Sequence, residues 1–454
     1  MAGDGFRLPG EFERQAAVWL CWPEHKYAAR GYDVHEVYAE VVAHLVDEVQ
    51  VYVNCGVEGT IDECRRVLAR RGMDLGRIVF TQFADRFHWA RDYGADIVVA
   101  AGEAPDRGRG AETGWSRPRR RLVSFGFDAY GMAGGHGLGG GYADCVADTR
   151  RIAAHQAVAM DCTDIVDSCL VSEGGDRESN GRGLMMTIAD TEVRKRNPGW
   201  SRQQVEAEFV RLFGLDKVIW LPWATYEDED FLDGVLDVVD GQPVYRSHSA
   251  NGHIDEMCRF VDEDTVLLAE VAEEDAKARH SARVTRWRLE AAREVLESST
   301  TADGRPLRVV RIPTPEPMHL VARPGDVIYE TWQEARAVLA ECGGGDDGGG
   351  AAGDGLRLRD GTRFPSGDIL MQPALSYCNF LICDGVVLGQ KYWKEGLPDA
   401  VRLKDEAAHR VLVEVFPGRQ VVMIDATALN ILGGGIHCIT KNVPWVPGEA
   451  EQSG

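Results

Sequence analysis

The chain has 454 residues, and 50 basic against 72 acidic side chains give a formal net charge of −22 at pH 7. This balance argues against a protein that binds nucleic acid or anionic membranes, because either class needs a basic face. It is compatible with a cationic ligand. An apolar content of 44% is typical of a globular protein with a large core.

The N-terminus lacks the basic start and apolar segment of a signal peptide, and no stretch has the roughly 18 apolar residues of a membrane span. The 11 cysteines include no CxxC pair, which argues against both a disulfide framework and a zinc ribbon. We therefore expect a reduced, cytoplasmic protein in which most cysteines are small buried hydrophobic residues.

Short apolar stretches typical of β-strands recur along the chain, at 49–54, 77–83, 95–100, 183–189, 217–223, 265–271, 379–390 and 419–426. Helical patterns lie between them, at 61–72, 201–214 and 273–299. Ser201 stands at the cap position of the second helix, and Gly214 stands just past its end. The alternation indicates an α/β chain with many short strands.

Three stretches have the composition of insertions or loops. Residues 101–140 are rich in Gly and Arg, 225–250 carry an acidic run, and 342–368 contain a run of Gly and Asp. We predict insertions at about these three places.

The segment GGGIHCITK (433–441) places Cys438 after a glycine turn, where the backbone can approach a ligand closely. Its β-branched residues suggest a strand end. Cys438 is a candidate nucleophile, and a buried structural cysteine is the alternative. His437 is a poor candidate base, because successive strand residues point to opposite faces.

The segment NGHIDEMCRF (251–260) contains a histidine and a carboxylate two residues apart. If it is extended, His253 and Asp255 share one face and can act as an acid/base and a cation clamp. A structural histidine on a half-buried strand and a metal site are the alternatives. The segment has no accompanying HxH or HExxH pattern, which argues against the metal site.

Two further segments place charged residues beside turns. In FHWARDYGADIVV (87–99), Arg91 and Asp92 lie between aromatic residues just before a strand, and Glu173 precedes two glycines in SEGGD. Asp92, Glu173 and His253 follow one another at intervals of about 80 residues. Polar residues at repeated intervals suggest repeated units that face a common axis.

Taken in order, several segments resemble the agmatine deiminase and bacterial peptidylarginine deiminase family of guanidine-modifying enzymes. They are LPGEFERQAAVWLCWPEH (8–25), WARDYGADIVV (89–99), SEGGD (172–176), KRNPGWSRQQVEAEF (195–209), NGHIDE (251–256), SYCNF (376–380) and GGGIHCITK (433–441). The resemblance runs over nearly the full length. It implies a five-bladed propeller of ββαβ units with loop insertions, in one catalytic domain over residues 1–454.

The resemblance also implies a role for each candidate residue: Cys438 as nucleophile, His253 as general acid/base, Glu173 as support of the histidine, Asp92 and Asp255 as carboxylates that grip the guanidinium, and Asn379 as a residue lining the pocket. A planar guanidinium suits two carboxylates, which accept its forked N–H donors. The expected reaction is hydrolytic deimination that releases ammonia and leaves a ureido product, with neither a metal nor an organic cofactor. Because carboxylates disfavour a thiolate, we expect the empty site to raise the pKa of Cys438 and a bound guanidinium to lower it.

The chain departs from the agmatine deiminase pattern at two places. SHSAN (247–251) stands before the GHxD motif where DETD is typical, and RDYGA (91–95) replaces RDTGP. The cationic guanidino substrate is therefore agmatine, free arginine, a peptide arginine or a biosynthetic guanidine. An amidinotransferase and a non-catalytic guanidine binder are further alternatives, and a homodimer is one assembly to expect.

Overall fold

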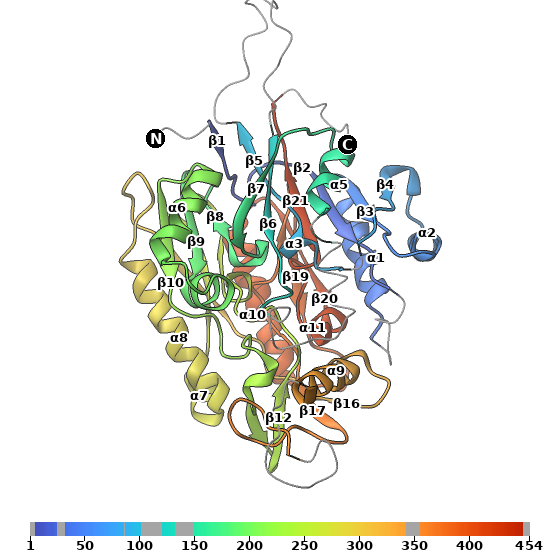
Figure 1. Ribbon diagram of the computed structural model, residues 1–454, viewed down its shortest axis with the longest axis vertical. Coiled ribbons are helices and arrows are strands. Elements are labelled where there is room, and N and C mark those ends of the chain that lie inside the picture. Colours follow the sequence, from blue (N-terminus) through green and yellow to red (C-terminus); the bar gives the residue numbers. More distant parts are fainter. Residues whose placement is uncertain are drawn as a thin grey trace, which may run out of the picture.

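The computed structural model describes residues 5–24, 32–85, 87–100, 120–131, 149, 151–341 and 355–447. Within these residues short sheets and helices form a mixed α/β fold (Figure 1). None of the helices described there is long and apolar enough to cross a membrane.

Five sheets share one pattern of strand pairing. The middle strand pairs antiparallel with one neighbour and parallel with the other. These sheets are β21 (Thr440–Pro444), β2 (Gln15–Cys21) and β3 (Gln50–Asn54); β5 (Asp96–Ala100), β6 (Arg120–Gly126) and β7 (Ile165–Val171); β8 (Glu178–Ser179), β9 (Leu184–Ile188) and β10 (Lys217–Leu221); β13 (Cys258–Phe260), β14 (Thr265–Glu270) and β15 (Arg308–Pro313); and β18 (Leu381–Ile382), β19 (Val386–Lys391) and β20 (Gln420–Asp425).

A helical connection joins the two parallel strands in each of these sheets, as parallel pairing requires. In chain order the connections are α1 (Val34–Leu45), α5 (Ile152–Ala159), α6 (Arg202–Phe213), the pair α7 (Glu273–Ala278) and α8 (His280–Glu297), and α10 (Asp399–Val415). The chain thus repeats a ββαβ unit. In one unit, the C-terminal strand β21 supplies the antiparallel partner of β2.

Additional elements extend this set. The first sheet continues through α2 (Thr60–Arg70), η2 (Leu75–Arg77) and β4 (Ile78–Thr81), and β1 (Phe6–Arg7) pairs with β5. A sixth sheet consists of β11 (Asp237–Val239), β12 (Gln242–Arg246), β17 (Ile369–Gln372) and β16 (Leu320–Ala322). It lies at the lower end of Figure 1, close to α9 (Val327–Glu341).

Two of the stretches predicted as insertions contain strands where they are described. Residues 120–126 form β6, which pairs with both β5 and β7 and is therefore part of a sheet. Residues 237–246 form the β11–β12 hairpin of the sixth sheet. Residues 101–119, 132–140 and 342–354 lie outside the described residues.

The strands and helices predicted from the sequence are confirmed, with two differences. The stretch 379–390 contains two strands, β18 and β19, joined by a turn. The predicted helix 273–299 is interrupted at Arg279, whose φ of −131° and ψ of 144° are extended, so it forms α7 and α8.

Burial explains why β9, β14 and β19 lie among the apolar stretches of the sequence. Residues of β9 are buried along its whole length, and β14 and β19 are buried except at their last residue. Strands covered on both faces have no polar side to alternate with. The described cysteines are all free thiols, as expected of a protein without a disulfide framework.

The start of α6 tests how local signals stabilise this fold. The Ser201 side chain accepts from the Gln204 backbone N–H at 3.3 Å, and the Gln204 side chain accepts from the Ser201 backbone N–H at 2.9 Å. Ser201→Ala removes one half of this capping box and should lower the free energy of unfolding by about 1 kcal/mol. Urea denaturation measures the change, with the exposed Gln203→Ala as the matched control; equal losses in the two variants would contradict the capping role.

Candidate active site

The six residues selected from the sequence occupy equivalent places in the repeated units, since each stands shortly before the first strand of one sheet. Asp92 lies in α3 (Ala90–Tyr93) before β5, Glu173 before η3 (Gly174–Asp176) and β8, His253 and Asp255 at η6 (Ile254–Glu256) before β13, Asn379 before β18, and Cys438 before β21. The recurrence of one place in successive units accounts for the spacing of about 80 residues noted above.

The structure brings all six residues together. The Cys438 Sγ lies 3.0 Å from the Asn379 Nδ2 and 3.8 Å from an Asp255 carboxylate oxygen. The His253 ring nitrogens lie 3.6 Å from Asp92, 3.5 Å from Glu173 and 4.0 Å from Asp255. All six side chains are buried. The cluster is therefore shielded from bulk water, and its electrostatic interactions are strong.

The local backbone differs from the sequence-based expectation at two positions. His253 and Asp255 do not lie on a strand; His253 stands just before the short helix η6, which contains Asp255, and this bend still turns both side chains to the same cluster. Cys438 lies in a turn two residues before β21. The alternation of faces expected for a strand therefore does not apply at His437.

His437 is a neighbour of the cluster that the sequence reasoning set aside. Its Nδ1 is 2.6 Å from the Asp255 Oδ2, and its Nε2 is 2.7 Å from the Glu11 Oε2. The second Asp255 oxygen, Oδ1, is buried and has no hydrogen-bond partner among the described residues. His437 thus occupies one oxygen of Asp255 and leaves the other free for a ligand.

The cluster depends on a close backbone approach at Gly175. A Cβ atom there would lie 2.5 Å from the His253 Nδ1 and 2.8 Å from the Asp92 Oδ1, which is closer than packed atoms tolerate. The Gly175 N–H itself donates to the Asp92 Oδ1 at 3.1 Å. The second glycine of SEGGD is therefore required by the geometry of the site.

Glu173 is held by a residue that the sequence did not single out. Arg196, at the end of the π-helical segment η4 (Asp190–Arg196), reaches both Glu173 oxygens through its Nε at 2.8 Å. Burial raises the pKa of Glu173, but the Arg196 charge and the nearby His253 outweigh it and lower the pKa to about 2. Glu173 is therefore ionised beside the histidine. The only sequence signal for Arg196 was its place in the segment KRNPGW.

Opposing effects set the charge of His253 and Asp92. Burial lowers the pKa of His253, but Asp92, Glu173 and Asp255 outweigh burial and raise it to about 10. Burial raises the pKa of Asp92 to about 6 despite the favourable charge of His253. Tyr130 also donates to the Asp92 Oδ2 at 2.9 Å. Near neutral pH the histidine is thus a cation, and Asp92 is mostly an anion.

The thiol lies in a negative environment. Burial is the main cause that raises the pKa of Cys438 well above 9, and Asp255, Asp92 and Glu256 raise it further. This is the direction expected from the sequence. Glu256 is a carboxyl group that the sequence reasoning missed: its Oε1 is 4.0 Å from the Cys438 Sγ and accepts from Asn379 at 3.0 Å. Burial also raises the pKa of Glu256 well above its usual value.

The cluster has donor atoms of two kinds. The ligand atoms of Asp255, Glu256 and Cys438 lie within 4.8 Å of one another and are the set that could hold a metal ion. The same arrangement offers carboxylate oxygens to a planar cation beside a thiol and a protonated histidine. Such a site can bind a guanidinium and present its carbon to a nucleophile.

Comparisons with known proteins match the chain over nearly its full length. A family model for the Porphyromonas-type peptidyl-arginine deiminases matches residues 7–240 and 235–444. The agmatine deiminase of Stutzerimonas stutzeri is 29% identical over 445 residues, covering 97% of this chain and 96% of the relative. The agmatine deiminase of Pseudomonas putida is 28% identical over 448 residues, with the same two coverages.

Solved structures show the same fold. The agmatine deiminase of Enterococcus faecalis superposes with a TM-score of 0.66 at 23% identity, covering 97% of this chain and 96% of that one. The substrate-bound agmatine deiminase of C. jejuni superposes with a TM-score of 0.63 at 16% identity, covering 96% of both chains. The chain therefore belongs to the Porphyromonas-type peptidyl-arginine deiminase family.

Proposed function

We propose that the chain is a cysteine-dependent hydrolase that deiminates a guanidino group. The observation that carries this proposal is the buried meeting of the Cys438 thiol, the protonated His253 and an Asp255 oxygen without a protein donor. A guanidinium supplies the missing donors and the missing positive charge at once.

Binding of the substrate changes the state of the nucleophile. Asp92 and Asp255 accept the N–H groups of the guanidinium and hold its carbon near Cys438. The bound cation offsets the burial and the carboxylates that raise the pKa of Cys438, so the thiol proton leaves to solvent and a thiolate forms.

The reaction then follows in two halves. The thiolate adds to the guanidinium carbon, and His253 gives its proton to one nitrogen, which leaves as ammonia as its bond to carbon breaks. The product of this half is an S-alkylthiouronium on Cys438. His253 next removes a proton from water, and the hydroxide adds to the same carbon. The carbon–sulfur bond then breaks as the hydroxyl proton passes to the leaving sulfur, which releases the ureido product and restores the thiol.

The remaining residues position these groups. Glu173 holds His253 and is itself fixed by Arg196. Asn379 donates to the Cys438 Sγ, and its side-chain oxygen accepts from the Cys438 backbone N–H at 3.3 Å. The chain's own residues therefore supply the nucleophile, the acid/base and the cation clamp.

Agmatine is the first substrate to test, because the curated relatives are agmatine deiminases; its product would be N-carbamoylputrescine. Peptidyl-arginine is the runner-up, which the family description favours. An amidinotransferase would pass the amidine to an amine instead of water, so a new guanidine would form when an amine is supplied. A non-catalytic binder has no need of the thiol.

We also propose that the five ββαβ units close into a five-bladed propeller around the site, within one catalytic domain over residues 1–454. The equivalent placement of the site residues, each before the first strand of a unit, supports this arrangement.

A cytoplasmic location is supported by the free thiols of the described cysteines. A homodimer remains a proposal that gel filtration with light scattering can test.

Removal of the thiol gives the most direct test of the nucleophile. Cys438→Ala should lower ammonia release from agmatine or arginine by at least about a thousandfold, because no other group forms the covalent intermediate. Guanidine binding, measured by calorimetry, should survive. Cys378→Ala is the matched control, since it removes a buried thiol next to Asn379. Turnover by the Cys438 variant close to that of the control would refute the assignment.

Ionisation of Cys438 should depend on the ligand. The ultraviolet absorbance of the thiolate, taken as wild type minus Cys438→Ala, is followed over a pH series without and with millimolar guanidinium. Because the empty site raises the thiol pKa, the cation should move thiolate formation to clearly lower pH. Equal midpoints in the two series would contradict substrate-assisted ionisation.

His437 should act on substrate binding through Asp255. His437→Ala removes the donor on the Asp255 Oδ2 and should raise the KM of the guanidine about tenfold, with a smaller effect on kcat. His437→Asn, which retains a donor, should recover part of the loss. A general structural role would instead lower kcat and the urea midpoint together, with no recovery in the Asn variant.

A further inference from the structure

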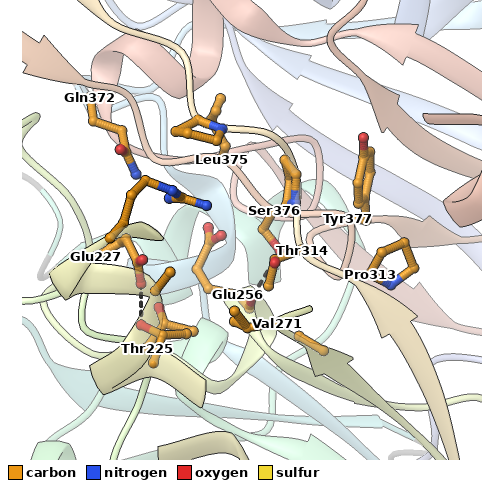
Figure 2. A pocket seen from close by; sticks show the side chains of 16 residues that line it. Thr225, Glu227, Glu256, Val271, Pro313, Thr314, Gln372, Leu375, Ser376 and Tyr377 are labelled. Atoms are coloured by element: carbon orange, nitrogen blue, oxygen red, sulfur yellow. Dashed lines mark hydrogen bonds between the residues drawn. The ribbon is translucent and has the colours of Figure 1, made fainter. Parts of the chain in front are cut away.

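A pocket opens beside the catalytic cluster, between the end of β14, the start of α8 and the segment after β17. Its cavity volume is about 50 Å³. Figure 2 shows the Glu256 side chain in the middle of this pocket, between Glu227 on one side and Thr314 and Ser376 on the other.

Glu256 connects the pocket to the reactive sulfur. Its carboxyl group lines the pocket, while its Oε1 lies 4.0 Å from the Cys438 Sγ. Glu256 is therefore a side chain that the pocket and the catalytic cluster share. Ala269, Val271 and Leu375 add apolar walls that suit the methylene groups of a substrate tail.

The pocket contains a positive charge that the protein leaves largely unused. Within the described part of the chain, the Arg279 guanidinium has one ion pair, at 3.8 Å to Asp275. Asp275 is already bound by Lys404 at 2.6 Å, so its charge is compensated. The Arg279 side chain is 19% exposed and lines the pocket. A guanidinium in such a position can bind a carboxylate through two parallel N–H donors.

A negative charge stands in the same pocket. Glu227 accepts from Thr285 through its Oε2, and its Oε1 has no hydrogen-bond donor among the described residues. Burial raises the pKa of Glu256 well above its usual value, which disfavours the charged form of this second carboxyl group. The pocket therefore presents one cation, Arg279, and one anion, Glu227.

We propose that this pocket binds the head group of an α-amino acid, with Arg279 on the carboxylate and Glu227 on the ammonium, so that the preferred substrate is a guanidino amino acid of the arginine type. The proposal rests on the proposed function and names its substrate class. The volume has room for roughly three to five water-sized groups. An α-amino acid head group has that size.

The other substrates match the pocket less well. Agmatine brings an ammonium for Glu227 but leaves Arg279 without a partner. An arginine inside a peptide has neither the free carboxylate nor the free ammonium. A substrate that lacks the carboxylate or the ammonium forgoes the corresponding ion pair and gains less affinity from the pocket.

The test compares wild type with Arg279→Gln on L-arginine, agmatine, guanidinobutyrate and a blocked arginine amide. Wild type should have the highest kcat/KM on L-arginine, at least about tenfold above agmatine. Arg279→Gln should lower kcat/KM on L-arginine and on guanidinobutyrate on the order of 10- to 100-fold, mainly through KM, and lower it far less on agmatine, which has no carboxylate. Arg283→Gln removes a charge from the exposed face of α8, the helix that begins just after Arg279, and is the matched control; there Arg283 meets His280 at 3.1 Å.

Glu227→Gln provides the complementary variant. It should lower kcat/KM on both ammonium-bearing substrates, L-arginine and agmatine, and spare guanidinobutyrate. An agmatine preference in wild type, or equal losses on all substrates in Arg279→Gln, would overturn the proposal. Binding of the same compounds to Cys438→Ala measures the pocket without turnover. If Cys438→Ala binds L-arginine preferentially while the wild type releases no ammonia, the proposed function is contradicted and the proposed role of the pocket is supported.

Discussion

The burial of several carboxyl groups around one thiol is the constraint on which the site depends. Asp92, Glu173 and Asp255 lie within 4.0 Å of the His253 ring, out of contact with bulk water. Such a concentration of negative charge is costly unless cations compensate it. Arg196 and protonated His253 compensate part of it, and Asp255 keeps one oxygen unsatisfied. The remaining negative charge favours a cationic ligand and disfavours the thiolate form of Cys438 in the empty site.

The repeated ββαβ unit explains how one chain delivers these groups to one place. Each unit offers the turn before its first strand, and these turns carry different side chains: carboxylates, a histidine, an amide and a thiol. Gly175 lets two of the turns approach, because a Cβ there would meet His253 and Asp92. The sixth sheet adds Gln372 to the wall of the neighbouring pocket, so an element outside the repeat helps to line that pocket.

The sequence predicts the reactive groups better than their partners. Cys438, His253 and Asp92 stand in short segments with distinctive neighbours, and the structure brings them together. Arg196 and Glu256 act through contacts with residues of other units, which no local pattern encodes. The alternation of strand faces failed at His437 because that rule holds for extended chain, whereas His437 lies in a turn. The helix ends show the same difference between local and non-local features. The cap at Ser201 is a local signal and was predicted, whereas the break at Arg279 was not.

The central claim is that Cys438 attacks a guanidinium held by buried carboxylates. Mass spectrometry of the enzyme, quenched in acid during turnover and digested, tests it most directly. The account predicts that the peptide containing Cys438 gains the mass of the substrate less one ammonia, and that the gain disappears in Cys438→Ala. An enzyme that converts substrate without this adduct, or that carries the adduct on another cysteine such as Cys378, would contradict attack by Cys438.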